Sequence, residues 1–303
     1  SIRNSPYKRD YKLIGFDYFP DTVGSFWCHK NYILPDILRK ENEQEWLEEI
    51  VSIIKKDKIE LLFIGVDFEL PLFSKYKSRI EKESNCLVVV SDERVISIGN
   101  DKFKTFQFLK ENGLYYPETY EPESCDFSML TFPVIVKPKV GARSVGVSIV
   151  DSLDKLEEVL KNTQDPIIQE YVGDDNTEYT CGVISLDGEL KHSIALNRTL
   201  KAGNTHLSSF SNDTPDIVKQ YLKDITDELK PFGSCNYQLR VDTQGIPKLF
   251  EINARHSGTT YMRSLFGYNE IIYLLKKLLD DEEYVFNLKE GRAIRYFEEQ
   301  LIK

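Results

Sequence analysis

The sequence predicts a protein of mixed α/β and α+β class, in which a parallel α/β unit precedes regions of antiparallel sheet. Near its beginning, short apolar runs alternate with a helical pattern, which is typical of parallel strands joined by crossover helices. Further along, short turns join adjacent strands, which is an antiparallel signature. The length of 303 residues exceeds one usual core. We therefore expect three units, at residues 1–98, 99–172 and 173–303.

The first unit is expected to contain parallel strands at 12–17, 59–65 and 87–91. Between the first two, apolar side chains at helical spacing predict an amphipathic helix. Its apolar positions are Trp46, Leu47, Ile50, Val51 and Ile54. The residues before Lys12 resemble the end of a helix and a loop, so we expect one earlier strand to be missing. The unit looks Rossmann-like, yet the sequence contains neither G-x-G-x-x-G nor the P-loop motif.

The second unit is expected to open with a helix at 102–112, capped by Asp101 and stopped by Gly113. The pattern then predicts a strand at 134–137, a loop at 138–146, a strand at 147–150, a helix at 153–160 and a strand at 167–171. In the third unit we expect two hairpins, 178–185 with 190–196 and 234–241 with 247–252, and helices at 216–229 and 269–279.

Composition argues against several classes of function. The net charge of −10 is unfavourable for nucleic-acid binding, which needs clustered Lys and Arg side chains. The five cysteines lie far apart without a C-x-x-C pair, so neither a disulfide framework nor a zinc site is indicated. No apolar run approaches the roughly 18 residues of a membrane span. The expected compartment is the cytoplasm.

The second hairpin carries the clearest local signal for chemistry. Strand alternation places Glu251 and Asn253 on one face, and Gln238 on the paired strand joins them. One carboxylate and two amides form a fitting partial shell for Mg²⁺, which prefers hard oxygen ligands. Without further context, an isolated E-x-N is more often an ordinary solvated strand face than a metal site.

Four segments in order resemble the ATP-grasp superfamily, nearest to carbamoyl phosphate synthetase large-chain domains and stand-alone carboxylate–amine ligases. They are NDKFKTFQFLKENGL at 100–114, FPVIVKPKVGARSVGV at 132–147, IIQEYVGDDNTEYTCGV at 167–183 and FEINARHSGTT at 250–260. The resemblance implies a Rossmann-like pre-ATP-grasp domain followed by a two-lobed ATP-grasp fold. The order of four segments is far more specific than any one motif.

The resemblance also implies roles for individual residues. Lys137 and Lys102 match basic contacts to the nucleotide phosphates, and 139–146, with Gly141, Ser144 and Gly146, matches a loop that covers the triphosphate. The hinge that reads adenine matches Glu170, Tyr171 and Val172, and Glu178 matches a carboxylate that binds ribose. The metal-ligand positions match Gln238, Glu251 and Asn253. Taken alone, Glu170 and Glu178 resemble ordinary solvated residues.

Arg255 matches an arginine near the transferred phosphoryl group. After it, Ser257 and Thr259 belong to a polar turn suited to an anionic substrate, while Arg198 and Lys201 are further candidates for the same cleft. A hairpin-end Arg or Lys more often faces water. His256 is expected to be structural rather than catalytic.

The resemblance predicts an ADP-forming ligase that joins a carboxylate to an amine or ammonia through an acyl phosphate. ATP and Mg²⁺ are the expected cofactors, with Mn²⁺ as an alternative ion, and the partners are small-molecule acids and amines, with a homodimer left open. A carboxyphosphate-forming carboxylase or synthetase domain is the competing enzyme. A non-catalytic nucleotide-binding protein is the alternative from another class.

Overall fold

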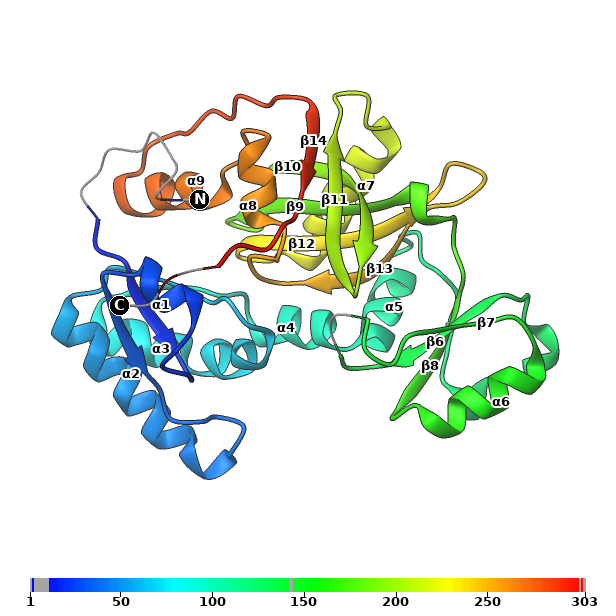
Figure 1. Ribbon diagram of the computed structural model, residues 1–303, viewed down its shortest axis with the longest axis horizontal. Coiled ribbons are helices and arrows are strands. Elements are labelled where there is room, and N and C mark those ends of the chain that lie inside the picture. The colour runs from blue at the N-terminus through cyan, green and yellow to red at the C-terminus, as the bar shows by residue number, and fades with distance from the viewer. Residues whose placement is uncertain (1, 3–10, 142–143, 300, 302–303) are drawn as a thin grey trace.

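The computed structural model describes residues 2, 11–141, 144–299 and 301. Within them the chain forms two small parallel sheets, a four-stranded sheet and a six-stranded sheet (Figure 1). The parallel strands lie in the N-terminal part and the antiparallel sheets follow, so the predicted fold class is confirmed. The bounds of the three expected units stay a prediction.

The N-terminal part alternates strands and helices. β1 (Ile14–Asp17) pairs in parallel with β2 (Lys30–Ile33), and β3 (Leu61–Phe63) with β4 (Leu87–Val89). The helices are α1 (Val23–Trp27), α2 (Glu43–Asp57), α3 (Leu70–Ser84) and α4 (Glu93–Asn100). All five apolar positions predicted for α2 are buried, because their spacing places them on the face toward the core.

Helix α5 (Lys102–Glu111) follows α4 and leads toward the four-stranded sheet. The Asp101 side chain accepts hydrogen bonds from the backbone N–H groups of Phe103 and Lys104. Gly113 has a φ of +66°, a left-handed conformation that ends the helical segment. The predicted cap and stop are both confirmed.

The four-stranded sheet has the order β5-β8-β6-β7. Its strands are β5 (Thr119–Tyr120), β6 (Val134–Pro138), β7 (Ser148–Val150) and β8 (Pro166–Glu170), and α6 (Leu153–Asn162) covers one face. Val134, Val136 and Ile168 face α6 in a small core of their own. Strand alternation therefore turns Ile135, Lys137 and Gln169 to the opposite face.

The six-stranded sheet has the order β13-β12-β9-β10-β11-β14. Its strands are β9 (Glu178–Leu186), β10 (Glu189–Lys201), β11 (Asn204–Phe210), β12 (Gly233–Val241), β13 (Pro247–Asn253) and β14 (Gly291–Ile294). Its helices are α7 (Asp216–Leu229), α8 (Thr260–Leu265) and α9 (Glu270–Leu275). Both predicted hairpins are confirmed. The helix expected at 269–279 is α9 followed by a π-helix at Lys276–Asp280.

Short 3-10 segments connect these elements. They lie at Lys40–Asn42, Asp67–Glu69, Pro122–Ser124, Phe127–Met129 and Asp175–Thr177. The segment at Asp67–Glu69 follows β3 and carries a residue of the candidate site.

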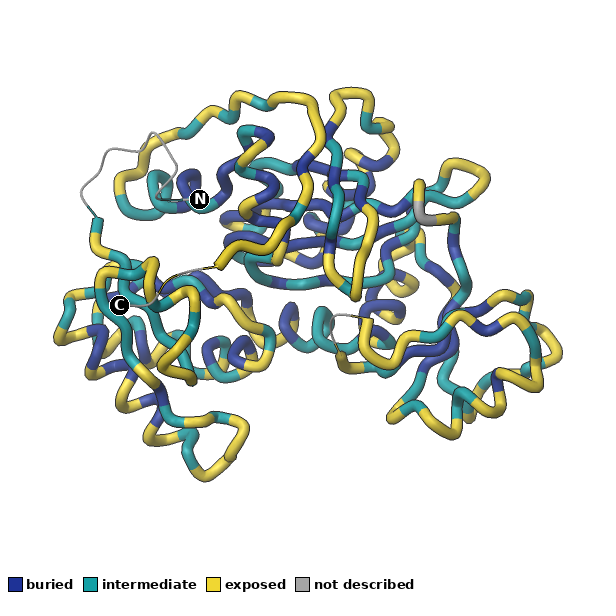
Figure 2. The backbone as a smooth tube through the Cα atoms, viewed as in Figure 1, coloured by how far each residue is buried: buried dark blue, intermediate teal, exposed yellow. Residues whose placement is uncertain are grey.

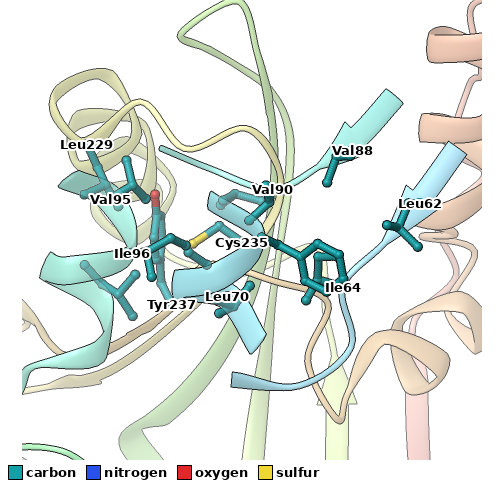
Figure 3. Close-up of a cluster of buried hydrophobic side chains, with 14 of the residues drawn as sticks. Leu62, Ile64, Leu70, Val88, Val90, Val95, Ile96, Leu229, Cys235 and Tyr237 are labelled. Carbon is teal, nitrogen blue, oxygen red and sulfur yellow. The ribbon is translucent and has the colours of Figure 1, made fainter. Parts of the chain in front are cut away.

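One large core joins the N-terminal part to the six-stranded sheet. Ile64 and Val90 from the N-terminal part pack in the same cluster as Cys235 and Tyr237 of β12 (Figure 3). Figure 2 shows the buried stretches concentrated along the central strands of the six-stranded sheet. None of the helices among the described residues has the length and apolar composition that a membrane crossing requires.

Candidate functional site

A pocket lies between the inner face of the four-stranded sheet and the adjoining face of the six-stranded sheet. Apolar side chains of Ile135, Val147, Leu200 and Phe250 line it beside charged groups. Many of the residues singled out from the sequence meet there. They are Lys102, Lys137, Gly141, Ser144, Glu170, Val172, Glu178, Arg198, Gln238 and Glu251.

Two buried lysines give the pocket a basic side. Lys137 Nζ donates to Gln169 Oε1 at 2.8 Å, and Gln169 Nε2 donates to Thr119 Oγ1 at 2.9 Å. Lys102 Nζ donates to the carbonyl oxygen of Gly141 at 2.9 Å. Burial lowers the pKa of Lys137 to about 7, and the positive charge of Lys102 acts in the same direction. No carboxylate is bonded to either amine among the described contacts, so both favour an anionic ligand.

Glu178 lies buried between two arginines. Arg198 Nε donates to its Oε1 at 2.8 Å, and Arg240 Nε donates to its Oε2 at 2.9 Å. Arg198 Nη2 also donates to Gln238 Oε1 at 2.6 Å. A hairpin-end arginine often faces water, but Arg198 is buried and links Glu178 with Gln238 inside the pocket.

Glu170 lies at the end of β8, where the chain leaves the four-stranded sheet. Its Oε1 accepts from Lys248 Nζ at 2.7 Å and its Oε2 accepts from the backbone N–H of Glu118 at 3.0 Å. The Arg240 guanidinium lies 5.3 Å from the centre of the Tyr171 ring. These contacts hold the end of β8, and the residue that follows it, against β12 and β13.

The three metal-ligand candidates lie together on β12 and β13. Gln238 is the cross-strand partner of Glu251, and Asn253 Nδ2 donates to Glu251 Oε1 at 3.1 Å. The pairing shifts after Gln238, and the resulting bulge leaves Phe250 as an extra residue on β13. Phe250 and Glu251 therefore both face the pocket, although strict alternation would place them on opposite faces.

Arg255 reaches across to the N-terminal part of the chain. Its Nε donates to Asp67 Oδ1 at 2.6 Å, and its Nη2 donates to Asp67 Oδ2 at 2.5 Å. Nη2 also donates to Asn253 Oδ1 at 3.2 Å, and Nη1 donates to the carbonyl oxygen of His256 at 3.1 Å. Arg255 thus connects the 3-10 segment that follows β3 with the metal-ligand candidate Asn253.

The polar turn after Arg255 rests on a buried ion pair. Arg263 Nη1 donates to Ser257 Oγ at 3.1 Å and to Thr259 Oγ1 at 2.8 Å, while its Nε donates to Glu270 Oε2 at 2.9 Å. Burial by itself raises the pKa of Glu270, but the charge of Arg263 and the bond to His256 outweigh it and hold the pKa well below its usual range. The hydroxyls of this turn are therefore engaged within the protein.

Two family models match the chain. One, described as ATP-grasp in the biosynthetic pathway with Ter operon, matches residues 162–300. The other, described as the D-ala D-ala ligase C-terminus, matches residues 103–208. The chain belongs to the ATP-grasp superfamily.

Relatives agree with this assignment. Carbamoyl-phosphate synthase of Methanobrevibacter smithii is 26% identical over 250 residues, which are 74% of this chain and 66% of that protein. The chain thus spans just under two thirds of that relative's length.

Solved structures show the same fold. The L-amino acid ligase from Bacillus licheniformis matches with a TM-score of 0.68 and 19% identity, over 88% of this chain and 67% of the other. The biotin carboxylase domain of 2-oxoglutarate carboxylase from Hydrogenobacter thermophilus, a dimer solved with MgADP, ADP and bicarbonate, matches with a TM-score of 0.68 and 12% identity. That match covers 91% of this chain and 65% of the other.

Some ATP-grasp candidates lie outside the pocket lining. Seven candidates among the described residues do not line the pocket, namely Gly146, Tyr171, Lys201, Asn253, Arg255, Ser257 and Thr259. Asn253 and Arg255 remain connected to it through Glu251, whereas Lys201 is exposed at the end of β10. Gly146 has a φ of +73°, and a Cβ there would lie 3.0 Å from the Pro138 ring, so a larger residue at this loop position would be strained.

Sequence reasoning missed five polar or aromatic residues of this candidate site, namely Asp67, Gln169, Arg240, Lys248 and Phe250. Arg240 had a signal, since it follows Gln238 by two positions on one strand face. Asp67 had none, because its partner Arg255 lies 188 residues away.

The three metal-ligand candidates offer oxygen atoms rather than a cluster of carboxylates, imidazoles or thiolates. No group of three or more His, Cys, Asp or Glu side chains suited to a metal occurs among the described residues. A set of one carboxylate and two amides falls outside that pattern, and its oxygens suit Mg²⁺. In this structure the Gln238 and Asn253 oxygens accept from Arg198 and Arg255. The Asn253 amide nitrogen faces Glu251, so the Asn253 amide would have to turn to share an ion with that carboxylate.

Proposed function

We propose that this ATP-grasp chain is an ADP-forming ligase, which activates a carboxylic acid with ATP and joins it to an amine or ammonia. One observation carries the proposal. A single pocket holds the buried amines of Lys102 and Lys137 together with the Glu251 carboxylate and the amide of its cross-strand partner Gln238. Family membership and the likeness to ligase models support the same class.

The nucleotide is assigned to the pocket between the sheets. Ile135, Val147 and Phe250 offer apolar surfaces for the flat base, and Lys102 and Lys137 offer positive charge for the phosphates. Glu178 is assigned to the ribose hydroxyls, with its charge balanced by Arg198 and Arg240. An apolar pocket with a few placed polar groups is the usual form of a small-molecule site.

The metal is assigned to Gln238, Glu251 and Asn253. A bound Mg²⁺ would neutralise phosphate charge there and help to align the γ-phosphate. Arg255, bonded to Asn253, is assigned to the reacting carboxylate and phosphoryl oxygens, where its guanidinium would stabilise growing negative charge.

The proposed reaction has two steps. A carboxylate oxygen of the acid attacks the γ-phosphorus of ATP, the bond to the bridging oxygen breaks, and ADP leaves with an acyl phosphate formed. The neutral amine then attacks the carbonyl carbon, inorganic phosphate leaves with that carboxylate oxygen, and the amine loses a proton. The chain's own contribution is to align the reactants and exclude water.

The first test is a screen for ADP release across small carboxylic acids, with and without amines, and with hydroxylamine as a trap for acyl phosphate. We expect one class of acids to give ADP and a hydroxamate that require both ATP and Mg²⁺. Bicarbonate in the same screen tests the carboxyphosphate-forming alternative, which would release ADP with bicarbonate alone.

The matched variants are Glu251→Ala and Glu83→Ala. Glu83 pairs with Arg79 on the exposed side of α3, far along the chain from the pocket, so its loss should leave turnover unchanged. Glu251→Ala should weaken Mg-dependent ATP binding much more than binding of ATP alone. Nucleotide binding without ADP release for any acid would favour the non-catalytic alternative.

A further inference from the structure

Arg255 is held by a carboxylate from another part of the chain. Asp67 lies in the 3-10 segment after β3, and both of its oxygens accept from Arg255, at 2.6 and 2.5 Å. The Arg255 side chain is 13% exposed and that of Asp67 is 41% exposed. A two-bond contact between planar groups fixes the orientation of the guanidinium as well as its position.

Four of the five N–H groups of Arg255 have hydrogen-bond partners. A guanidinium carries five N–H groups. Two bind Asp67, one binds Asn253 Oδ1 and one binds the His256 carbonyl oxygen, which leaves one Nη1 N–H without a partner among the described residues. The side chain is therefore locked in one orientation with a single donor to offer.

We propose that Asp67 is a positioning residue for the ligase reaction, and that it acts only through Arg255. This inference rests on the proposed function, and it makes the N-terminal part of the chain a component of the catalytic site. Asp67 orients the guanidinium so that its remaining donor and its charge meet the reacting carboxylate or phosphoryl group. Without Asp67, Arg255 keeps its charge but loses its fixed plane.

The contact network favours positioning over competition. A carboxylate that merely blocked Arg255 would be displaced by the acid, and its removal would tighten acid binding. Asp67 instead belongs to a continuous series of contacts, from Asp67 through Arg255 and Asn253 to Glu251. A disturbed Arg255 therefore also disturbs the residues next to the transferred phosphoryl group. Small misplacements of this kind cost on the order of 100-fold in rate.

The experiment is a double-mutant cycle of Asp67→Asn and Arg255→Ala, with Glu83→Gln as the matched control. In Asp67→Asn we expect kcat for acid-dependent ADP formation to fall about 10- to 100-fold, with an unchanged KM for Mg-ATP. The double variant should be no slower than Arg255→Ala alone, since Asp67 has nothing left to position. Asp67→Glu should restore part of the loss.

Three results would overturn the inference. They are wild-type kcat in Asp67→Asn, a lower KM for the acid with unchanged kcat, and a second, multiplicative loss in the double variant. Thermal unfolding of the wild type, the two single variants and the double variant provides a readout independent of activity. Non-additive shifts in Tm are expected, and additive shifts would deny the pair. Failure to find any acid for the wild-type protein would instead count against the proposed function.

Discussion

Lys137 is a buried lysine that lines the pocket and has only the Gln169 amide as a described hydrogen-bond partner. With a pKa of about 7, its amine is mostly neutral at pH 8 before any nucleotide binds. Phosphate oxygens favour the charged form, so binding of Mg-ATP should raise this pKa. At pH 8 the positive charge that Lys137 offers to the phosphates is therefore acquired largely on binding.

We predict that Mg-ATP binding at pH 8 takes up close to one proton in the wild type and none through this group in Lys137→Met. Affinity should fall by up to about tenfold per pH unit as the pH rises above the free-state pKa and below the bound-state pKa. Calorimetry in two buffers of different ionisation enthalpy measures the proton uptake. Equal uptake in both proteins would assign the proton to another group.

Glu178 balances two buried cations, which makes its charge a structural requirement. We predict that Glu178→Gln lowers the free energy of unfolding by about 3–5 kcal/mol, because Arg198 and Arg240 would keep buried charges without a carboxylate. Urea unfolding at pH 7 measures this. The exposed pair of Arg79 and Glu83 is the control, where Glu83→Gln should cost about 1 kcal/mol or less. A similar small cost for both variants would contradict this account.

At the scale of single elements, the start of α5 couples helix capping to the pocket. The backbone N–H of Lys102 donates to the carbonyl oxygen of Lys139, and the Lys102 side chain holds Gly141. Asp101 fixes this end of the helix by capping it. The position of a phosphate contact thus depends on a residue that does not line the pocket.

We predict that Asp101→Ala costs about 1 kcal/mol of stability and also weakens Mg-ATP binding. Asp92→Ala is the matched control, because Asp92 caps α4 by accepting from Val95 N and lies outside the described pocket lining. It should cost similar stability and leave nucleotide affinity unchanged. Chemical unfolding measures the stability of both variants, and nucleotide titration measures their affinity. Equal nucleotide affinities in the two variants would show that the Asp101 cap does not influence the pocket.

At the scale of the whole molecule, the cores differ in extent. The large core runs from the N-terminal helices through β9 and β12, whereas the four-stranded sheet closes over its own small cluster against α6. A small separate core opens at lower free energy than a large continuous one. The two walls of the pocket therefore differ in stability.

We predict that backbone amides of β6 and β8 exchange hydrogen through an opening of lower free energy than those of β9 and β12. Mg-ATP should protect β6 and β8 most, because Lys137 on β6 contacts its phosphates in the proposed complex. Hydrogen exchange followed by mass spectrometry measures both effects. Equal protection of the two sheets before and after nucleotide would show a single cooperative unit.

The sequence was informative where local periodicity decides the structure. Alternation placed Gln238 opposite Glu251, and capping rules identified Asp101 at the start of α5. Alternation failed at Phe250, because a bulge adds a residue that no local pattern marks. The burial of Arg198 and the pairing of Asp67 with Arg255 depend on contacts between distant segments, and single-sequence patterns carry no such information.

The central claim is that ATP activates a carboxylate through an acyl phosphate, and oxygen transfer tests it directly. The acid found by the screen is supplied with ¹⁸O in its carboxylate, and the products are analysed by mass spectrometry. The account predicts ADP without label and inorganic phosphate carrying one ¹⁸O atom from the acid. Release of AMP, or inorganic phosphate that carries no ¹⁸O from the acid, would contradict it.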